Sequence, residues 1–310
     1  MPKNFKQYTI GVDVGGTNIK FGLIDPAGKI ALRSHLSTKR YIRNKNLLIR
    51  AIVAEIRDLI KNAGVAAREV RGIGFGLPGL IDPSRGVVNF LPNIPGWKNV
   101  PLARMIKDQL KVPVMIENDV NLITLGEWKF GAGKGIRNLV CMTLGTGVGG
   151  GLIINDQLYQ GETFVAGEIG HMPLNEDGPA CNCGGWGCFE RYVGNQQLEQ
   201  RAAHIFHNNR IRLEDVFLLA KQGNKRAIQF WHEVGVHIGN ALVGIVNVLN
   251  PKMIIIGGGV SHNLVFMQKS IQRVIQERAM SVQAKTVKIV KARLGDDAGI
   301  LGAKVLFDET

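Results

Sequence analysis

Residues 8–25 read YTIGVDVGGTNIKFGLID and decide the class of fold. A β-rich run ends at Asp13, breaks at Gly15-Gly16 and resumes as a second apolar run at Ile19. This pattern predicts a strand, a tight glycine turn and a second strand. Because glycines let backbone N–H groups approach an anion closely, and Thr17 adds a hydroxyl donor, the turn is a candidate phosphate site. A Gly-Gly hairpin can also be a turn and nothing more.

The same arrangement recurs about 130 residues later. A strand-like run at 138–144 leads into the glycine turn Gly145–Gly151, which begins Gly145-Thr146-Gly147, and apolar residues follow at 152–154. Neither turn is a P-loop, because no Gly-Lys-Ser/Thr follows the glycines, and neither is a dinucleotide fingerprint, because each leads into a strand. The repeat predicts two related lobes that each present a backbone loop to a shared cleft.

Three further candidate groups stand at the ends of predicted strands. Asp13 can hold a hydrated Mg²⁺ beside the phosphates. Gly257-Gly258-Gly259 follows the apolar run 253–256 and either accommodates the flat face of a nucleoside or is an ordinary turn. Asp119 follows the predicted strand 112–116 and is the candidate carboxylate that takes the acceptor's proton in phosphoryl transfer. Asn118 beside it can hydrogen-bond a sugar hydroxyl; the alternative is that Asp119 only caps the helix that we expect from there to about residue 130.

The cysteine spacing indicates a metal site. Three of the four cysteines, Cys181, Cys183 and Cys188, lie within eight positions, downstream of His171. Three thiolates and one imidazole form a closed tetrahedral zinc set, which is structural and not catalytic. The alternative is a group of free buried thiols.

Two carboxylates, Glu168 and Glu190, flank the four candidate zinc ligands. They are candidates to accept hydrogen bonds from sugar hydroxyls, so that the zinc would hold the walls of a sugar pocket. The alternative is that both are solvated surface groups. Cys141, the fourth cysteine, lies in an apolar run and is expected in the core.

Length and composition favour two domains, since the chain has 310 residues of which 45% are hydrophobic. The net charge of +13 comes from Lys and Arg scattered along the chain, which predicts a basic surface without a nucleic-acid site. The first residues lack the apolar run of a signal peptide, and no run of about 20 apolar residues follows. We therefore expect a soluble cytoplasmic protein with no membrane partner.

Apolar periodicity and breakers place the remaining elements. Helices are expected at 46–63, 101–110, 195–206, 212–221, 224–249 and 263–279 and from about 296, and strands at 72–77 and 286–291.

Six motifs together resemble the ROK family (repressors, open reading frames and kinases), over nearly the whole chain. The motifs are D-x-G-G-T-x-x-K at Asp13–Lys20, G-x-P-G at Gly76–Gly79, E-N-D at Glu117–Asp119, the second glycine turn at Gly145–Gly151, E-x-G-H at Glu168–His171 and C-x-C-G-x-x-G-C-x-E at Cys181–Glu190. The resemblance implies the two-lobed α/β fold of the actin, Hsp70 and hexokinase superfamily, which is ribonuclease H-like with a duplicated lobe and here a small structural zinc site. It places the small lobe at 1–119, completed by the C-terminal helix 297–310, and the large lobe at 120–296.

The resemblance also implies roles for individual residues. Asp119 would be the catalytic base, and His171 would hold zinc through one ring nitrogen and a sugar hydroxyl through the other. The sugar-binding residues would be Gly79, Asn93, Asn118, Asp119, Glu168, His171 and Glu190. Asn93 lies in a loop whose length varies among relatives. The nucleotide and phosphate residues would be Asp13, Gly15, Gly16, Thr17, Lys20, Gly145, Thr146, Gly147 and Gly258.

The implied activity is ATP-dependent phosphorylation of a hexose, with ATP, Mg²⁺ and structural zinc as cofactors. Glucose is the first expectation, while N-acetylmannosamine, N-acetylglucosamine and fructose stay open, as do donors other than ATP. The acceptor would sit deep between lobes that close over it and exclude water, and the protein would be a homodimer.

Two rivals remain. The family's transcriptional regulators carry an additional N-terminal helix-turn-helix, for which the residues before Asp13 leave no room. A non-catalytic sugar-binding protein would not need Asp119 together with two phosphate turns. We therefore expect a kinase.

Overall fold

The computed structural model describes residues 7–41, 44–92 and 94–308. The chain forms two compact units. Unit 1 comprises Met1–Gly135, Leu158–Ala166 and Leu294–Thr310, and unit 2 comprises Ile136–Gln157 and Gly167–Arg293. Each unit has a hydrophobic core of its own. In the described part of the chain, no helix is both long and apolar enough to cross a membrane.

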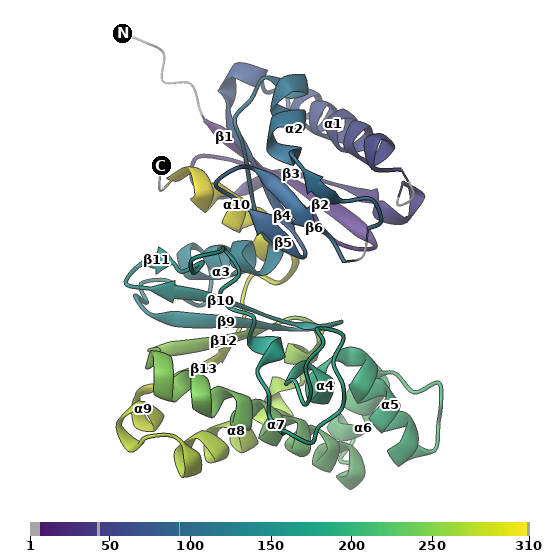
Figure 1. Cartoon of the computed structure of the whole chain (residues 1–310), viewed down its shortest axis with the longest axis vertical. Coiled ribbons are helices and arrows are strands. Elements are labelled where there is room, and N and C mark those ends of the chain that lie inside the picture. The colour runs from purple at the N-terminus through teal and green to yellow at the C-terminus, as the bar shows by residue number, and fades with distance from the viewer. Residues whose placement is uncertain (1–6, 42–43, 93, 309–310) are drawn as a thin grey trace. The chain divides into compact units, whose positions relative to one another are not determined.

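Unit 1 is built on a five-stranded sheet in the order β3-β2-β1-β4-β8 (Figure 1). Its strands are β1 (Tyr8–Val14), β2 (Asn18–Ile24), β3 (Ile30–Ser37), β4 (Val70–Leu77) and β8 (Val114–Asn118). The first three strands run antiparallel as a meander, and β4 and β8 continue parallel to β1. The predicted strand, turn and strand are confirmed. A smaller sheet of β5 (Leu80–Asp82), β6 (Val87–Phe90) and β7 (Lys98–Val100) was not predicted.

The two faces of this sheet differ in side-chain size. Ile10 and Val12 belong to the core that also holds the apolar face of α1 (Lys45–Asn62), and α2 (Leu102–Leu110) adds to that core. On the other face, glycines replace large side chains. A Cβ on Gly11 would overlap the carbonyl of Ile300, so α10 (Ala298–Asp308) lies directly on the backbone of the sheet.

Helix α3 (Asp119–Lys129) packs closely against α10. A Cβ on Gly126 would overlap the Ala298 carbonyl, and one on Gly302 would overlap the Leu122 carbonyl. This close crossing holds α3 in unit 1. The units therefore differ from the lobes predicted from the sequence, since α3 and the segment 158–166 belong to unit 1 instead of the second lobe.

The sheet of unit 2 has the order β11-β10-β9-β12-β13. Its strands are β9 (Leu139–Leu144), β10 (Val148–Ile154), β11 (Gln157–Leu158), β12 (Met253–Gly257) and β13 (Lys288–Lys291). As in unit 1, a first strand pairs antiparallel with the next on one side and parallel with a later strand on the other. The predicted duplication is thus confirmed. The predicted glycine turn is shorter than expected, since β10 begins at Val148 and Gly149–Gly151 lie within it.

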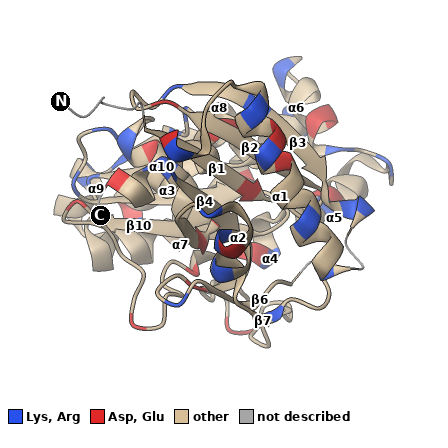
Figure 2. Cartoon of the chain, turned by 90° about the horizontal axis from the view of Figure 1, so that it is seen from above, with Lys and Arg blue, Asp and Glu red and all other residues tan. Residues whose placement is uncertain are grey.

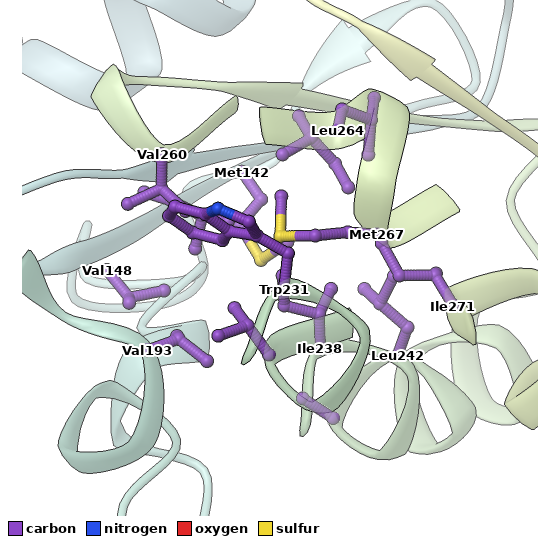
Figure 3. Close-up of a cluster of buried hydrophobic side chains, with 14 of the residues drawn as sticks. Met142, Val148, Val193, Trp231, Ile238, Leu242, Val260, Leu264, Met267 and Ile271 are labelled. Atoms are coloured by element: carbon purple, nitrogen blue, oxygen red, sulfur yellow. The ribbon is translucent and has the colours of Figure 1, made fainter. Parts of the chain in front are cut away.

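Helices of unit 2 bury the large core of that unit. They are α4 (Glu190–Val193), α5 (Asn195–Phe206), α6 (Leu213–Lys221), α7 (Lys225–Leu249), α8 (Leu264–Arg278) and α9 (Ser281–Thr286). Trp231 of α7 is fully buried among Met142 of β9, Val260 of the 3-10 turn after β12, and Met267 of α8 (Figure 3). The helices predicted from periodicity are confirmed within a few residues, whereas α4 and α9 were not predicted. Cys141 is buried, as expected.

The basic residues do not gather on one element. Figure 2 shows Lys and Arg interspersed with Asp and Glu over the ribbon. Several are paired with acids, as in Arg33 with Asp297, Arg137 with Asp156 and Arg212 with Glu199. This distribution agrees with the predicted scattered basic surface.

Candidate functional site

The first glycine turn is closed by its own backbone and supported from behind. Gly15 N–H donates to the Asn18 carbonyl at 3.0 Å. Thr38 lies fully buried beside the turn, where its N–H donates to the Thr17 carbonyl at 2.9 Å and its hydroxyl donates to the Gly15 carbonyl at 2.8 Å. These contacts fix the shape of the turn, and Gly16 and Thr17 are exposed in it. Backbone N–H groups of such a turn can bind an anion. Thr38 was not predicted.

Asp13 and Lys20 face each other across the β1–β2 hairpin. Burial raises the pKa of the Asp13 carboxyl, Lys20 lowers it, and Asp296 raises it. The Lys20 ammonium also lies 2.8 Å from Asp296, a partner that was not predicted. A single protein carboxylate at a strand end beside the glycine turn is compatible with Mg²⁺, which keeps most of its water ligands.

Asn118 and Asp119 form the corner between β8 and α3. Asn118 caps the helix, since its Oδ1 accepts from Val120 N–H at 2.9 Å and from Asn121 N–H at 3.2 Å. Asp119 is therefore the first helical residue, and the alternative in which Asp119 is the N-cap is wrong. Its Oδ1 also accepts from Val120 N–H at 2.9 Å.

Gly79 lies against the same corner. Its φ of +99° and the overlap that a Cβ would make with the Phe90 carbonyl both require glycine. The Asn118 amide nitrogen lies 3.5 Å from the Gly79 carbonyl, a long contact. Unit 1 thus brings together three of the predicted sugar residues, namely Gly79, Asn118 and Asp119. Asn93 lies outside the described residues.

Glu117 lies beneath this corner and was predicted only as a letter of the E-N-D motif. The residue is 2% exposed. Burial raises the pKa of its carboxyl, while hydrogen bonds from Asn121, Asn118 and Gln160 act in the opposite direction. No local pattern pointed to Gln160.

The second glycine turn, in unit 2, is held by neighbours on both sides. Gly145 N–H donates to the Gly147 carbonyl at 2.9 Å, and the Gly145 carbonyl accepts from Asn195 N–H at 2.9 Å. Glu190 Oε2 accepts from Val148 N–H at 2.8 Å, so this carboxylate is bonded to the strand that leaves the turn and is not a free surface group. Thr146 is exposed at the tip.

Gly258 lies next to the strand that enters this second turn. Its φ is +79°, and a Cβ would overlap the Leu144 carbonyl. The close approach brings the end of β12 to the end of β9, so the predicted nucleotide residues of unit 2 lie together.

The four predicted zinc ligands converge in unit 2. Their ligand atoms all lie within 4.8 Å of one another, with His171 Nδ1 3.7 Å from Cys181 Sγ and Cys183 Sγ 3.6 Å from Cys188 Sγ. A tetrahedral zinc with Zn–S bonds of about 2.3 Å separates its sulfurs by about 3.8 Å, so the donor set fits this ion. Cys181 and Cys188 are buried and Cys183 is exposed.

The His171 ring also faces one of the predicted sugar residues. Its Nε2 lies 3.9 Å from Glu168 Oε2, while Nδ1 points to the thiols. The side chain of Glu168 is 55% exposed, which leaves its oxygens accessible to a ligand.

The model of the ROK family matches residues 9–310. The chain belongs to the ROK family. Relatives within the family include enzymes and regulators. A glucokinase of Halalkalibacterium halodurans is 33% identical over 311 residues, which span 96% of this chain and 93% of the relative. A xylose repressor of Caldicellulosiruptor bescii is 30% identical and is matched over 96% of this chain and 78% of its own length.

The solved structures agree with the fold. The crystal structure of a ROK family glucokinase from Streptomyces griseus, in complex with glucose and AMPPNP, superposes with a TM-score of 0.79 at 32% identity. The match covers 98% of this chain and 100% of the other. The chain thus has the α/β two-lobed ROK kinase fold that the motifs predicted.

Proposed function

We propose that this chain is an ATP-dependent hexose kinase that phosphorylates glucose, with Asp119 as the general base. The observation that carries the proposal is the position of Asp119, whose partly exposed carboxylate lies next to Asn118 at the start of α3. The same chain contains both glycine turns. The 33% identity to a glucokinase along almost the whole chain supports glucose as the acceptor.

The chemistry assigned to Asp119 is proton transfer. A sugar hydroxyl oxygen attacks the terminal phosphorus, the bond from that phosphorus to the oxygen of the ADP leaving group breaks, and the hydroxyl proton passes to the Asp119 carboxylate. General-base assistance of this kind contributes about 10² to 10⁴ in rate. Phosphoryl transfer otherwise depends on positioning and charge neutralisation, which the remaining residues supply.

The sugar is assigned to polar groups around Asp119 and the zinc motif. In unit 1, the Asn118 Oδ1 is occupied by the helix cap, so its amide nitrogen is the group that donates to a hydroxyl. In unit 2, Glu168, Glu190 and the Nε2 of His171 serve as hydroxyl partners. We assign zinc a structural role, because four protein ligands leave no open coordination position. Asn93 is proposed on the family resemblance alone.

The nucleotide is assigned to the two glycine turns. Gly15, Gly16 and Thr17 in unit 1, and Gly145, Thr146 and Gly147 in unit 2, present backbone N–H groups and threonine hydroxyls to phosphate oxygens. Lys20 adds a positive charge, and the exposed Gly258 is assigned to the nucleoside. Asp13 would hold Mg²⁺, which would supply positive charge beside the phosphates.

We further propose that the enzyme is a cytoplasmic homodimer, an expectation that rests on the family resemblance. Sedimentation equilibrium tests the dimer. A mass of twice 33.9 kDa supports it, and a monomer mass at micromolar concentration contradicts it.

The activity is tested by ADP release from ATP-Mg²⁺ with purified protein. Glucose, mannose, fructose, N-acetylglucosamine and N-acetylmannosamine are assayed in parallel, and a reaction without sugar reports ATP hydrolysis. Turnover that requires glucose supports the proposal, and turnover on another sugar corrects the acceptor. Silence on all five, with glucose binding retained in calorimetry, contradicts a kinase and favours the sugar-responsive role suggested by the repressor relative.

A further inference from the structure

Glu117 is a carboxylate buried directly before the proposed catalytic corner. It is the fourth residue of β8 and is 2% exposed. Burial of an ionised carboxylate is costly unless hydrogen bonds compensate for the lost water. Three N–H donors surround it, and their positions along the chain indicate what the buried group does.

Oε1 of Glu117 accepts hydrogen bonds from residues on both sides of Asp119 in the sequence. It accepts from the backbone N–H of Asn118 at 2.8 Å and from the side-chain amide of Asn121 at 2.9 Å. One donor precedes Asp119 and the other lies in the first turn of α3. The same carboxylate oxygen therefore ties the end of the strand to the start of the helix, around the residue between them.

Oε2 of Glu117 holds a segment from elsewhere in the chain. It accepts from Gln160 Nε2 at 2.6 Å. Because a carboxylate only accepts hydrogen bonds, the Gln160 amide must present its nitrogen here. Gln160 lies in the segment 158–166, which belongs to unit 1 although the residues on both sides of it belong to unit 2. The Gln160 carbonyl accepts from Ala166 N–H at 3.0 Å, which closes this segment into a loop.

We infer that the hydrogen-bonded pair of Glu117 and Gln160 positions Asp119. The pair fixes the corner between β8 and α3 and anchors the loop 158–166 to that corner. The inference rests on the proposed role of Asp119 as the base. Neither residue of the pair is assigned contact with the sugar or the nucleotide. Loss of the Gln160 donor leaves a buried carboxylate oxygen without its partner, so Glu117 is expected to shift towards water and to move Asn121 with it.

The test is Gln160→Ala, with Gln157→Ala as the matched control. Gln157 lies three residues earlier and its side chain is exposed on β11. A displacement of about 1 Å in a catalytic group costs up to roughly 10²-fold, so we expect kcat for glucose to fall at least about tenfold in Gln160→Ala. The KM for ATP should stay within about twofold, because the turn at Gly145–Gly147 is untouched. Gln157→Ala should match the wild type.

Two further measurements separate positioning from loss of stability. Hydrogen exchange of residues 118–123 and 158–166 should accelerate in Gln160→Ala and not in Gln157→Ala. In an Asp119→Ala background, Gln160→Ala should reduce the residual kcat no further, because residues that act as a unit are not additive.

The outcomes are distinct. Wild-type kcat and unchanged exchange in Gln160→Ala overturn the positioning role, and an additional loss of kcat in the Asp119→Ala background does so as well. If the wild type turns over no sugar, the proposed function has failed. Hydrogen exchange then decides the anchoring alone, since lost protection at 118–123 and 158–166 supports it and retained protection overturns it.

Discussion

Glu117 and Asp119 are carboxylates two positions apart, and their surroundings give them different tasks. Glu117 is 2% exposed and receives three N–H donors, whereas Asp119 lies partly exposed at the start of α3. Glu117 still belongs to β8, whereas Asp119 is the first residue of α3, so the two carboxylates lie on different elements. One short motif thus contains a structural acid and the proposed base.

The raised pKa of Glu117 predicts how stability depends on pH. Because the folded state holds this proton above the ordinary pKa of 4.5, the carboxyl contributes less stability as pH rises through the interval between 4.5 and its raised pKa. The difference in unfolding free energy between wild type and Glu117→Gln should therefore decrease with increasing pH and then level off. Urea unfolding of both proteins between pH 4.5 and 8 measures this difference. An increase with pH would mean that the three hydrogen bonds outweigh burial.

Glycines within helices have different surroundings in the two units. Gly302 of α10 lies against the Leu122 carbonyl of α3, whereas Gly244 of α7 is exposed with only the tip of Met172 near it. The same residue type therefore serves close packing in one helix and only weakens the other.

Substitution of these two helical glycines by alanine should have opposite effects. Gly302→Ala should destabilise the protein by about 1–3 kcal/mol or more, because a Cβ overlaps the backbone of α3. Gly244→Ala should stabilise it by about 0.5–1 kcal/mol, because alanine is the better helix former and has open space there. Thermal or urea unfolding measures both. Equal effects in the two variants would contradict the close crossing of α3 and α10.

The zinc motif is held by the ligand set and by the turns between its members. Cys183→Ser should remove bound zinc and weaken glucose binding, because His171 and Glu190 lose their support. Cys141→Ser is the control, since Cys141 is buried in β9 and is not among the four ligands. Elemental analysis of the purified proteins gives the zinc content. Zinc retained at wild-type stoichiometry in Cys183→Ser would mean that the ligand set is different.

Local patterns predicted the elements better than the contacts between them. Three signals each lie within a few neighbouring residues: the Gly15-Gly16 turn, the α7 periodicity and the cysteine spacing. The structure confirms the turn and the helix and brings the cysteines together. Thr38 lies 23 residues from Gly15, and Gln160 lies 43 residues from Glu117. Such partners are chosen by tertiary packing, which leaves no mark on the spacing of the sequence.

Both units of the molecule use one sheet order, and each sheet carries one glycine turn between its first two strands. The sequence repeat predicted this duplication because the turns recur. The boundary between the parts was less predictable. It depends on Gly126 and Gly302, which allow α3 to pack closely on α10. The residues that neighbour each glycine in the sequence do not indicate which helix it will contact.

The net charge of +13 should affect the binding of the anionic substrate, ATP, and have little effect on the binding of the neutral substrate, glucose. Long-range attraction between a basic protein and a nucleotide is screened by salt. Raising the ionic strength from about 0.05 M to about 0.5 M should increase the KM for ATP several-fold and leave the KM for glucose nearly constant. Steady-state kinetics with each substrate varied in turn measures both. A parallel rise in the two KM values would indicate a general effect of salt on the enzyme.

The role of Asp119 is decided by comparing Asp119→Asn with the wild type in two assays on the same preparations, kcat for glucose and calorimetric binding of glucose. Asparagine keeps the size and hydrogen-bonding capacity of the side chain but cannot serve as the base. We predict a fall in kcat of about 10² to 10⁴ with glucose affinity changed only a few-fold. Turnover retained within tenfold of the wild type would contradict Asp119 as the base and, with it, the proposed catalytic site.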